Sequence, residues 1–251
     1  DTIFRLHGRL DILQEKALNN NRKRKELCMK YNIAIDGPAG AGKSTIAKKL
    51  AADLGYIYVD TGAMYRAMAY YFIQNKIAAD NEKAVAEACA DVDITIQYRD
   101  GEQQVLLNGE NVNGVIRNEE VGNMASATSV YPVVRTKLVD LQRQLAQKEN
   151  VIMDGRDIGT VVLPDANVKI YLTAGSRVRA ERRYKELQEK GVHCDLDEIE
   201  KDIIDRDYRD MHRETSPLKQ ADDAVCLDSS NLDIDGVVSE MKKIIQSKAQ
   251  V

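Results

Sequence analysis

The sequence predicts an α/β fold in which a parallel sheet is flanked by helices on both faces. Three observations carry this prediction. Short β-branched, apolar runs alternate with helical patterns of about ten to fifteen residues, which is typical of βαβ units. A glycine-rich loop joins the first strand to the first helix, and a single hairpin pattern interrupts the alternation.

The first part of the predicted core begins at residue 31. The run YNIAID is short and largely apolar, as expected for a buried strand. The segments that follow it alternate between the apolar patterns of helices and of strands. The predicted elements are a strand over 31–36, a helix over 43–54, a strand over 56–59 and a helix over 63–74.

The alternation of single strands and helices is interrupted after residue 80. A brief helix precedes two strands, 94–98 and 104–108, and the turn sequence RDGE between them predicts an antiparallel hairpin. A helix is expected over 119–127. We interpret residues 80–130, approximately, as an insertion on the parallel core.

The alternation of helices and strands resumes after the insertion. A helix with proline in its first turn is predicted from residue 132. The helices over 176–213 are rich in arginine and poor in apolar residues, so we expect residues 176–216 to form a mobile flap or lid. The remaining predictions are helix 132–148, strands 151–154 and 168–172, helices 176–190 and 197–213, strand 225–227 and helix 233–247.

Composition excludes several classes of protein. The 251 residues are 43% apolar and 30% charged, and no apolar run is long enough to span a membrane. The net charge of -4 and the absence of tryptophan argue against a nucleic-acid surface. The four cysteines lie far apart without metal-ligand spacing, which is typical of reduced thiols in the cytoplasm: Cys28, Cys89, Cys194 and Cys226.

Residues 1–28 differ from the rest of the chain. They carry seven basic against four acidic residues and end in three asparagines followed by the run RKRK. They lack the apolar segment of a secretory signal. We expect a leader outside the fold, disordered or loosely helical, with an RNA-binding arm as the alternative, and a domain over 29–251.

Residues 37–44, GPAGAGKS, match the pattern of a phosphate-binding loop between a strand and a helix. Glycines let successive backbone N–H groups point at a polyphosphate, and the lysine reaches its outer phosphates. We expect a nucleoside triphosphate here, with the Ser44 hydroxyl on Mg²⁺ and Thr45 behind it. The predicted phosphate-binding residues are Gly37, Pro38, Ala39, Gly40, Ala41, Gly42, Lys43, Ser44 and Thr45.

The loop alone does not separate kinases from other nucleotide-binding proteins. The guanine-reading pattern NKxD is missing, because NKIA at 75–78 lacks the aspartate. The strand 151–154 ends in DGRD rather than in the adjacent Asp-Glu typical of motor ATPases. These absences favour a phosphotransferase that acts on a small molecule.

Transfer between two anionic substrates requires cations beyond the phosphate-binding loop. Arg66 follows a predicted strand-to-helix turn, and Arg156 follows a strand at the edge where open α/β sheets bind ligands. Arg206, Arg209 and Arg213 share one face of a helix, although an ion-paired surface helix remains the alternative. The pair at 182–183 is expected to face solvent as support for the flap.

Several long motifs in one order resemble the bacterial-type cytidylate (CMP) kinase family from about residue 29 to the C-terminus. They are IDGPAGAGKST (35–45), VDTGAMYR (59–66), NGENVNGVIRNEEV (108–121), MASATSVYPVVR (124–135), MDGRDIGTVVLPDANVKIYLTA (153–174), RDYRDMHR (206–213) and ADDAVCLDSS (221–230). The resemblance implies the fold of P-loop nucleoside monophosphate kinases. The hairpin-bearing insertion would belong to the monophosphate-binding region and residues 206–213 to the lid side.

The resemblance further implies transfer of the γ-phosphoryl group of ATP, with Mg²⁺, to CMP or dCMP by a monomeric enzyme. Lys43, Arg156, Arg206 and Arg213 would be catalytic. The residues implied to hold CMP are Thr61, Arg66 and Arg156 at the phosphate, Ser126 and Arg135 at the cytosine edge, and Asp157, Arg206, Asp210 and Arg213 at the sugar, the base or over the phosphates. The family often has serine in place of Thr61 and can have glycine in place of Ser44, so Thr45 is the alternative hydroxyl for the metal.

Two alternatives remain open. The acceptor could be another small molecule, such as UMP, dTMP or shikimate, although shorter relatives manage without the insertion. The chain could also bind nucleotide as a regulatory module and transfer nothing. A second site for an anion, formed by the arginines, would argue against this second alternative.

Overall fold

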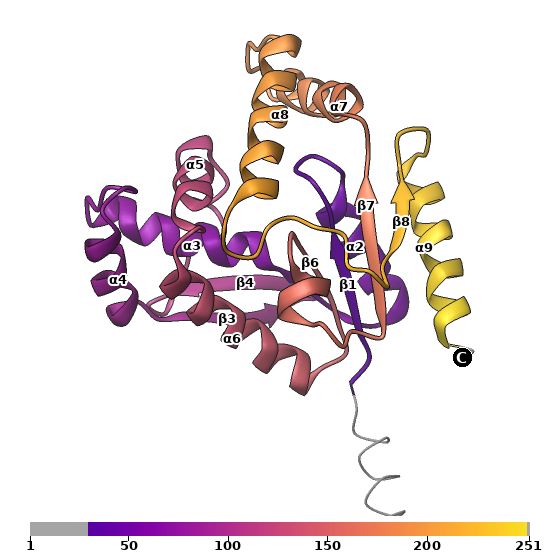
Figure 1. Ribbon diagram of the computed structural model, residues 1–251, viewed down its shortest axis with the longest axis horizontal. Helices are drawn as coiled ribbons and strands as arrows, with labels where there is room; N and C mark the ends of the chain where they lie inside the picture. The colour runs from indigo at the N-terminus through magenta and orange to yellow at the C-terminus, as the bar shows by residue number, and fades with distance from the viewer. Residues whose placement is uncertain (1–29, 250–251) are drawn as a thin grey trace, which may run out of the picture.

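A five-stranded parallel sheet forms the centre of the molecule, as the sequence predicts (Figure 1). The computed structural model describes residues 30–249, so the expected leader at 1–28 lies outside the described residues. The strand order is β2-β6-β1-β7-β8 and every neighbouring pair is parallel. The strands are β1 (Asn32–Asp36), β2 (Ile57–Asp60), β6 (Val151–Gly155), β7 (Val168–Thr173) and β8 (Val225–Asp228).

Helices cover both faces of this sheet. Ile33 and Ile35 of β1 pack in the apolar cluster that contains α2 (Lys43–Leu54) and α9 (Ile234–Ala249). Ala34, between them, belongs to the opposite cluster with α3 (Thr61–Gln74) and α6 (Pro132–Lys148). Successive side chains of a strand point to opposite faces, which is why a strand buried on both sides is apolar throughout.

The predicted insertion forms a second, antiparallel sheet in the order β3-β4-β5. Its hairpin turn is tighter than expected, because Arg99 already pairs with Glu102 and only Asp100 and Gly101 form the loop, with φ of 53° and 77°. Two positive φ values match the twist of a two-residue hairpin. The elements of this region are α4 (Glu82–Asp91), β3 (Ile94–Arg99), β4 (Glu102–Leu107), β5 (Glu110–Asn111) and α5 (Glu119–Thr128).

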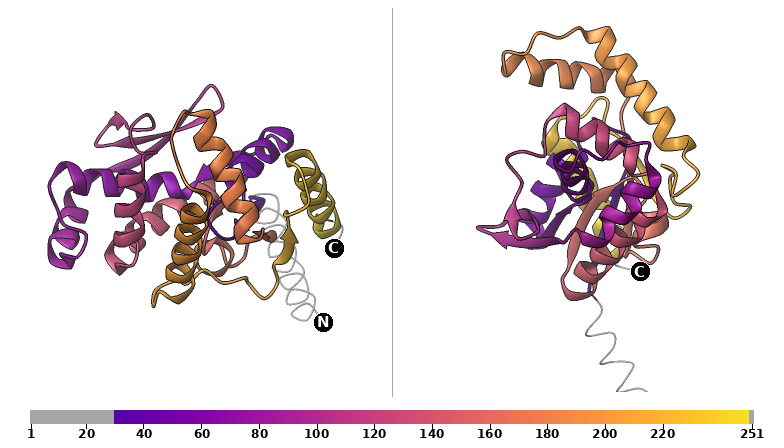
Figure 2. Two further views of the ribbon diagram at one scale, coloured as in Figure 1. Left: turned by 90° about the horizontal axis from the view of Figure 1, so that it is seen from above. Right: turned by 90° about the vertical axis from the view of Figure 1, so that its left-hand side faces the viewer.

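Two highly charged helices, α7 (Ser176–Glu189) and α8 (Leu196–His212), stand above the carboxyl edge of the parallel sheet (Figures 1 and 2). They bury little apolar surface: the buried apolar residues are Ala180 in α7 and Ile203 in α8. Ion pairs join the two helices instead, including Arg179 to Asp207 at 2.7 Å and Arg177 to Asp197 at 2.6 Å.

Two elements were not predicted. One is the short strand β5, and the other is a single wide helical turn at Ile158–Val162. The buried Asp36 carboxylate at the end of β1 accepts hydrogen bonds from the backbone N–H groups of Ile158 and Gly159, at 2.8 and 2.7 Å. This contact spans more than a hundred residues of sequence, so no local pattern could indicate the turn.

Within residues 30–249, no helix is long and apolar enough to cross a membrane. The cysteines in this range are free thiols: Cys89 is buried, Cys194 half-buried and Cys226 exposed. Cys28 lies outside the described residues.

Candidate functional site

A cavity of about 890 Å³ opens at the carboxyl edge of the parallel sheet. Its walls come from the loop before α2, the start of α3, α5, α6, the end of β6, the charged helices α7 and α8, and the loop before α9. Ten lysine or arginine side chains line it against seven carboxylates, although the chain as a whole is acidic. The positive charge of this protein is therefore concentrated where open α/β sheets bind ligands.

The loop between β1 and α2 has a backbone that only glycine allows at two points. Gly37 has a φ of 149°, and a Cβ atom there would lie 1.9 Å from the carbonyl oxygen of Leu172 in β7. Gly42 has a φ of 85° and immediately precedes the first residue of α2. The chain thus turns directly against the sheet and presents the N-terminus of α2 to the cavity.

Lys43 is buried at the first position of α2, and its Nζ donates to the carbonyl oxygen of Pro38 at 2.7 Å. Burial lowers the pKa of Lys43 well below its usual value, and the nearby cation of Arg156 lowers it further. An anion beside this ammonium group would favour its charged form.

Ser44, Asp154 and Tyr58 form a group of oxygen atoms beside the loop. The Ser44 hydroxyl donates to Asp154 Oδ2 at 2.9 Å and the Tyr58 hydroxyl to Asp154 Oδ1 at 3.0 Å. Burial, followed by the neighbouring Asp60 carboxylate, raises the pKa of Asp154 to about 6. A hydroxyl with a carboxylate behind it is a donor set that suits a hard divalent cation such as Mg²⁺. No cluster of three or more His, Cys, Asp or Glu suited to a metal occurs in residues 30–249.

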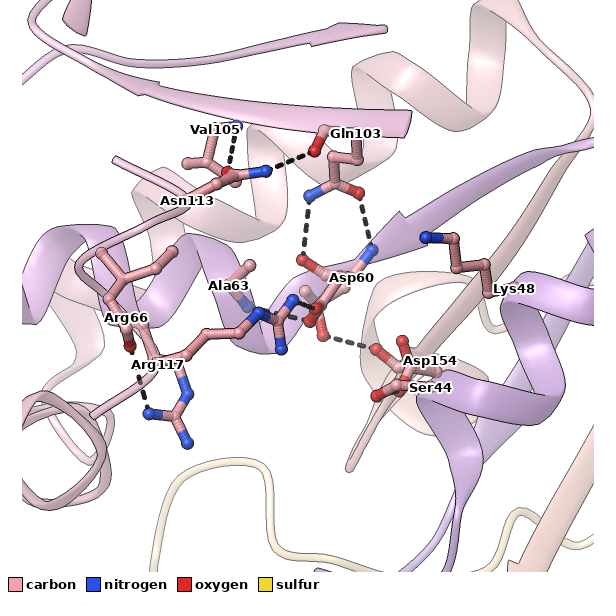
Figure 3. A network of polar contacts seen from close by, with 12 residues as sticks. Ser44, Lys48, Asp60, Ala63, Arg66, Gln103, Val105, Asn113, Arg117 and Asp154 are labelled. Atoms are coloured by element: carbon pink, nitrogen blue, oxygen red, sulfur yellow. Dashed lines mark hydrogen bonds and ion pairs between the residues drawn. The ribbon is translucent and has the colours of Figure 1, made fainter. Parts of the chain in front are cut away.

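The start of α3 contributes Thr61 and Arg66 to the lining of the cavity. The Asp60 carboxylate caps this helix by accepting from the Ala63 N–H at 2.9 Å, and Arg117 pairs with its other oxygen at 2.6 Å (Figure 3). Thr61 Oγ1 donates to the Asp154 carbonyl oxygen at 2.6 Å. Arg66 donates to two backbone carbonyls, those of Ile116 and Asn118, at 3.3 Å each, and has no ion-pair partner in residues 30–249.

Arg156 and Arg206 meet near the middle of the cavity. Arg156 Nε donates to Asp210 Oδ2 at 2.8 Å, and this contact joins the end of β6 to α8. Arg206 has no ion-pair partner among the described residues, and its buried Nε makes no hydrogen bond there. Burial lowers the pKa of Arg206 to about 10, and the neighbouring Arg156 cation acts in the same direction.

A buried ion pair joins Arg135 of α6 to Asp157, after β6. The Arg135 guanidinium lies 5.5 Å from the ring centre of Tyr65, and Arg213 approaches Asp157 and Asp210 at 3.9 Å each. Burial raises the pKa of Asp210 while Arg156 lowers it, and the net shift is downward, so the carboxylate is charged at neutral pH. Ser126 of α5 lines the same end of the cavity.

Nearly all the predicted site residues line this one cavity, which joins segments that are far apart in the sequence. The exceptions are Gly37 and Pro38, which shape the loop but lie beneath its lining residues. The site residues that line the cavity are Ala39, Gly40, Ala41, Gly42, Lys43, Ser44, Thr45, Thr61, Arg66, Ser126, Arg135, Arg156, Asp157, Arg206, Asp210 and Arg213.

Two expectations about arginines are wrong. Arg209 is exposed and does not line the cavity, because it sits about 60° round the helix from Arg206 and Asp210 takes its place. Arg182 does not face solvent as expected: it lines the cavity, half-buried, and donates to the Ser229 carbonyl oxygen at 2.7 Å. The neighbouring Arg183 also lines the cavity but is exposed and paired with Glu186.

Several lining residues were not identified as site residues from the sequence, among them Tyr65, Arg117, Asp154 and Arg179. Asp154 carried a usable signal, since an aspartate at the carboxyl end of a buried parallel strand lies at the ligand-binding edge of the sheet. Arg117 and Arg179 carried none, because their partners Asp60 and Asp207 are distant in the sequence.

Comparison with known proteins gives a consistent result. The family model for cytidylate kinase matches residues 33–247. The cytidylate kinase of Lactobacillus johnsonii is 52% identical over 226 residues, which are 90% of this chain and 98% of that relative. Those of Alkaliphilus metalliredigens and Streptococcus mutans are 52% and 49% identical over 86% and 87% of this chain and 96% and 97% of theirs. A shikimate kinase structure from Bacteroides thetaiotaomicron covers 86% of this chain and 98% of its own at 14% identity, with a TM-score of 0.45 that is too low to bear on function. The match over most of the chain, at about half of all positions, shows that this protein belongs to the cytidylate kinase family.

Proposed function

We propose that this protein transfers the γ-phosphoryl group of ATP to CMP or dCMP, giving ADP and CDP or dCDP. One observation carries the proposal beyond family membership. A single cavity joins a phosphate-binding loop to a second set of guanidiniums, of which Arg66 and Arg206 have no ion-pair partner in residues 30–249. A protein that binds only one nucleotide has no need of this second set.

In this proposal, the two ends of the cavity bind different substrates. We assign the donor phosphates to residues 39–45 and the acceptor phosphate to Thr61, Arg66 and Arg156. In this proposal the insertion at about 80–130 belongs to the monophosphate-binding region and residues 176–216 form the lid. Closure of the lid would exclude water from the transfer and suppress hydrolysis of ATP.

The reaction needs no dedicated general base, because the acceptor is already an anion. An oxygen of the CMP phosphate bonds to the γ-phosphorus as the bond from that phosphorus to the β,γ-bridging oxygen breaks, and ADP leaves with the electron pair. Lys43, Arg156, Arg206 and Arg213 hold the reacting groups together against their mutual repulsion and stabilise the charge that develops.

The oxygen atoms of Ser44 and Asp154 fit Mg²⁺ bound together with the triphosphate. The metal supplies neutralisation of phosphate charge and polarisation of the transferred group. Asp154 orients the Ser44 hydroxyl, and Thr45 is the second hydroxyl within the same turn of α2.

Selection of cytosine is assigned to Ser126, Arg135, Asp157, Asp210 and Arg213. Cytosine has an amine donor at C4 where uracil has an acceptor. A charged carboxylate such as Asp210 favours the amine, while Ser126 and Arg135 can satisfy O2 and N3. The wrong base would leave buried polar groups unpaired, at a cost of about 1 to 3 kcal/mol for each lost contact.

A panel of acceptors with ATP and Mg²⁺, followed by coupled release of ADP, tests this function. We expect kcat/KM to be highest for CMP and dCMP, and Lys43→Ala to reduce kcat by about two orders of magnitude or more. Equal kcat/KM for UMP would contradict the cytosine selectivity. Preferred turnover of UMP, dTMP or shikimate would identify a different kinase, and nucleotide binding without turnover would favour a regulatory module.

We also propose that the enzyme acts as a monomer in the cytoplasm without binding nucleic acid. The free thiols of Cys89, Cys194 and Cys226 support a reducing compartment. A sedimentation measurement at micromolar concentration checks the oligomeric state.

A further inference from the structure

The outer edge of the parallel sheet beside the acceptor site is covered by side chains rather than by another strand. Among the described strands, β2 is the last on this side of the sheet and pairs only with β6. The N–H of Ile57 points toward the neighbouring strand β6 and donates to the Asn150 carbonyl oxygen. The N–H and C=O groups of successive residues in a strand point to alternate sides, so those of Tyr58 and Asp60 point away from β6, toward the open edge of the sheet. Such outward groups need partners.

The antiparallel hairpin supplies these partners at two points. The Tyr98 hydroxyl of β3 donates to the Tyr58 carbonyl oxygen at 3.0 Å. Gln103 of β4 binds Asp60 with both ends of its amide: Oε1 accepts from the Asp60 N–H at 2.7 Å, and Nε2 donates to the Asp60 carbonyl oxygen at 3.2 Å (Figure 3). This side-chain amide takes the place of a neighbouring strand's peptide group.

Asp60 is the residue that begins the acceptor end of the cavity. It caps α3, Thr61 follows it directly, and Arg66 lies on the same helix about one and a half turns later. The direction of the Asp60 peptide therefore sets where α3 starts and how both side chains enter the cavity.

Gln103 is itself held in place. Asn113, in the sequence motif at 108–121, donates through Nδ2 to the Gln103 carbonyl oxygen at 2.7 Å and accepts from the Val105 N–H at 2.9 Å (Figure 3). The segment after β5 thus fixes the backbone from which the Gln103 side chain extends.

We propose that Gln103 is a positioning residue for the acceptor: by clamping the Asp60 peptide, it holds Thr61 and Arg66 where they receive the monophosphate. The inference rests on the proposed function and deepens it, because it gives the small antiparallel sheet a role at the phosphate in addition to any contact with the base. Within residues 30–249, the hydrogen bonds of the Gln103 side chain go to Asp60 and not to residues 37–45 of the phosphate-binding loop, so the two KM values can be compared.

Gln103→Ala and Tyr98→Phe form a matched pair for the test, made in the full chain. Both remove hydrogen bonds between the same hairpin and the same strand, but only Gln103 binds the residue at the start of α3. We expect Gln103→Ala to raise KM for CMP about tenfold while KM for ATP stays within about twofold of the wild type. Tyr98→Phe should lower the melting temperature and leave both KM values within about twofold of the wild type.

Gln103→Glu covers the case in which the alanine variant does not fold. It keeps an acceptor for the Asp60 N–H but sets a carboxylate oxygen against the Asp60 carbonyl, so KM for CMP should again rise while KM for ATP does not. A wild-type KM for CMP in Gln103→Glu, or equal rises in both KM values in a folded Gln103→Ala, would overturn the proposal. Wild-type protein that releases no ADP with CMP would instead overturn the proposed function.

Discussion

At the scale of single residues, a buried cation in the cavity destabilises the folded state. Arg206 is a largely buried cation beside Arg156 with no ion-pair partner among residues 30–249, and its pKa is lowered to about 10. A lowered pKa in a basic group means that the folded state disfavours the charged form, so this side chain destabilises the protein at neutral pH.

Arg206→Met should therefore raise the free energy of unfolding by about 1 to 3 kcal/mol while it raises KM for CMP at least tenfold. Urea denaturation and steady-state kinetics measure the two effects. The exposed Arg209 is the matched control, and Arg209→Met should leave both quantities nearly unchanged. A variant at 206 that is less stable than the wild type and binds CMP normally would contradict this account.

Asp36 makes stability depend on pH. Burial raises its pKa to about 6, although two backbone N–H groups act in the opposite direction. The folded pKa lies above that of the unfolded chain, so the favourable contribution of the neutral form is complete below about pH 4 and is lost as pH rises through about 6.

The free energy of unfolding of the wild type, relative to Asp36→Asn, should fall by about 3 kcal/mol between pH 3 and pH 7 and stay level above pH 7. Urea titrations of both proteins at a series of pH values measure this difference. A difference that is constant across the series would show that Asp36 titrates normally.

At the scale of elements, the phosphate-binding loop depends on a close approach between two strands' ends. Gly37→Ala would place a methyl group against the backbone of β7, which cannot move without disturbing the sheet. We expect this variant to lose ATP binding, as measured by calorimetry.

Gly55→Ala is the control for backbone strain alone. Gly55 also has a positive φ, 67°, at the end of α2, but a Cβ atom there would meet open space. The Gly55→Ala substitution should lower the free energy of unfolding by about 1 kcal/mol and leave the affinity for ATP unchanged. Normal ATP affinity in Gly37→Ala would show that the approach to Leu172 is not what shapes the loop.

Elements governed by local patterns were predictable from the sequence. The bounds of α2 and α6 match the predictions, because a glycine before one and a proline at the start of the other mark where they begin. Helix α3 begins two residues earlier than expected, since the Asp60 cap was not recognised. The turn at Ile158–Val162 depends on tertiary contacts that no local pattern specifies, whereas the i, i+3 spacing of Arg206 and Arg209 already implies their separation of about 60° round the helix.

At the scale of the whole molecule, the site was predictable in outline because motifs at the carboxyl ends of parallel strands must meet at one edge. The pairing of particular cations with particular carboxylates could not be predicted from the sequence. The contacts of Arg117 with Asp60 and of Gln103 with the Asp60 peptide join the insertion to the core, and nothing in either segment alone indicates them.

Removal of residues 1–28 tests whether the domain is self-sufficient. The described fold and every lining residue of the cavity lie after this segment. We expect kcat and both KM values of a chain that begins at Met29 to stay within about twofold of the full chain. A large loss of kcat, measured by ADP release at saturating substrates, would assign the segment a role in catalysis.

The guanidiniums of Arg66 and Arg206 also influence how long the polypeptide survives. A bound phosphate dianion supplies their missing countercharge, and a ligand that binds only the folded state reduces the time that the chain spends open to proteases. We therefore expect the monophosphate on which we propose this protein acts to protect the folded chain from proteolysis in proportion to its concentration.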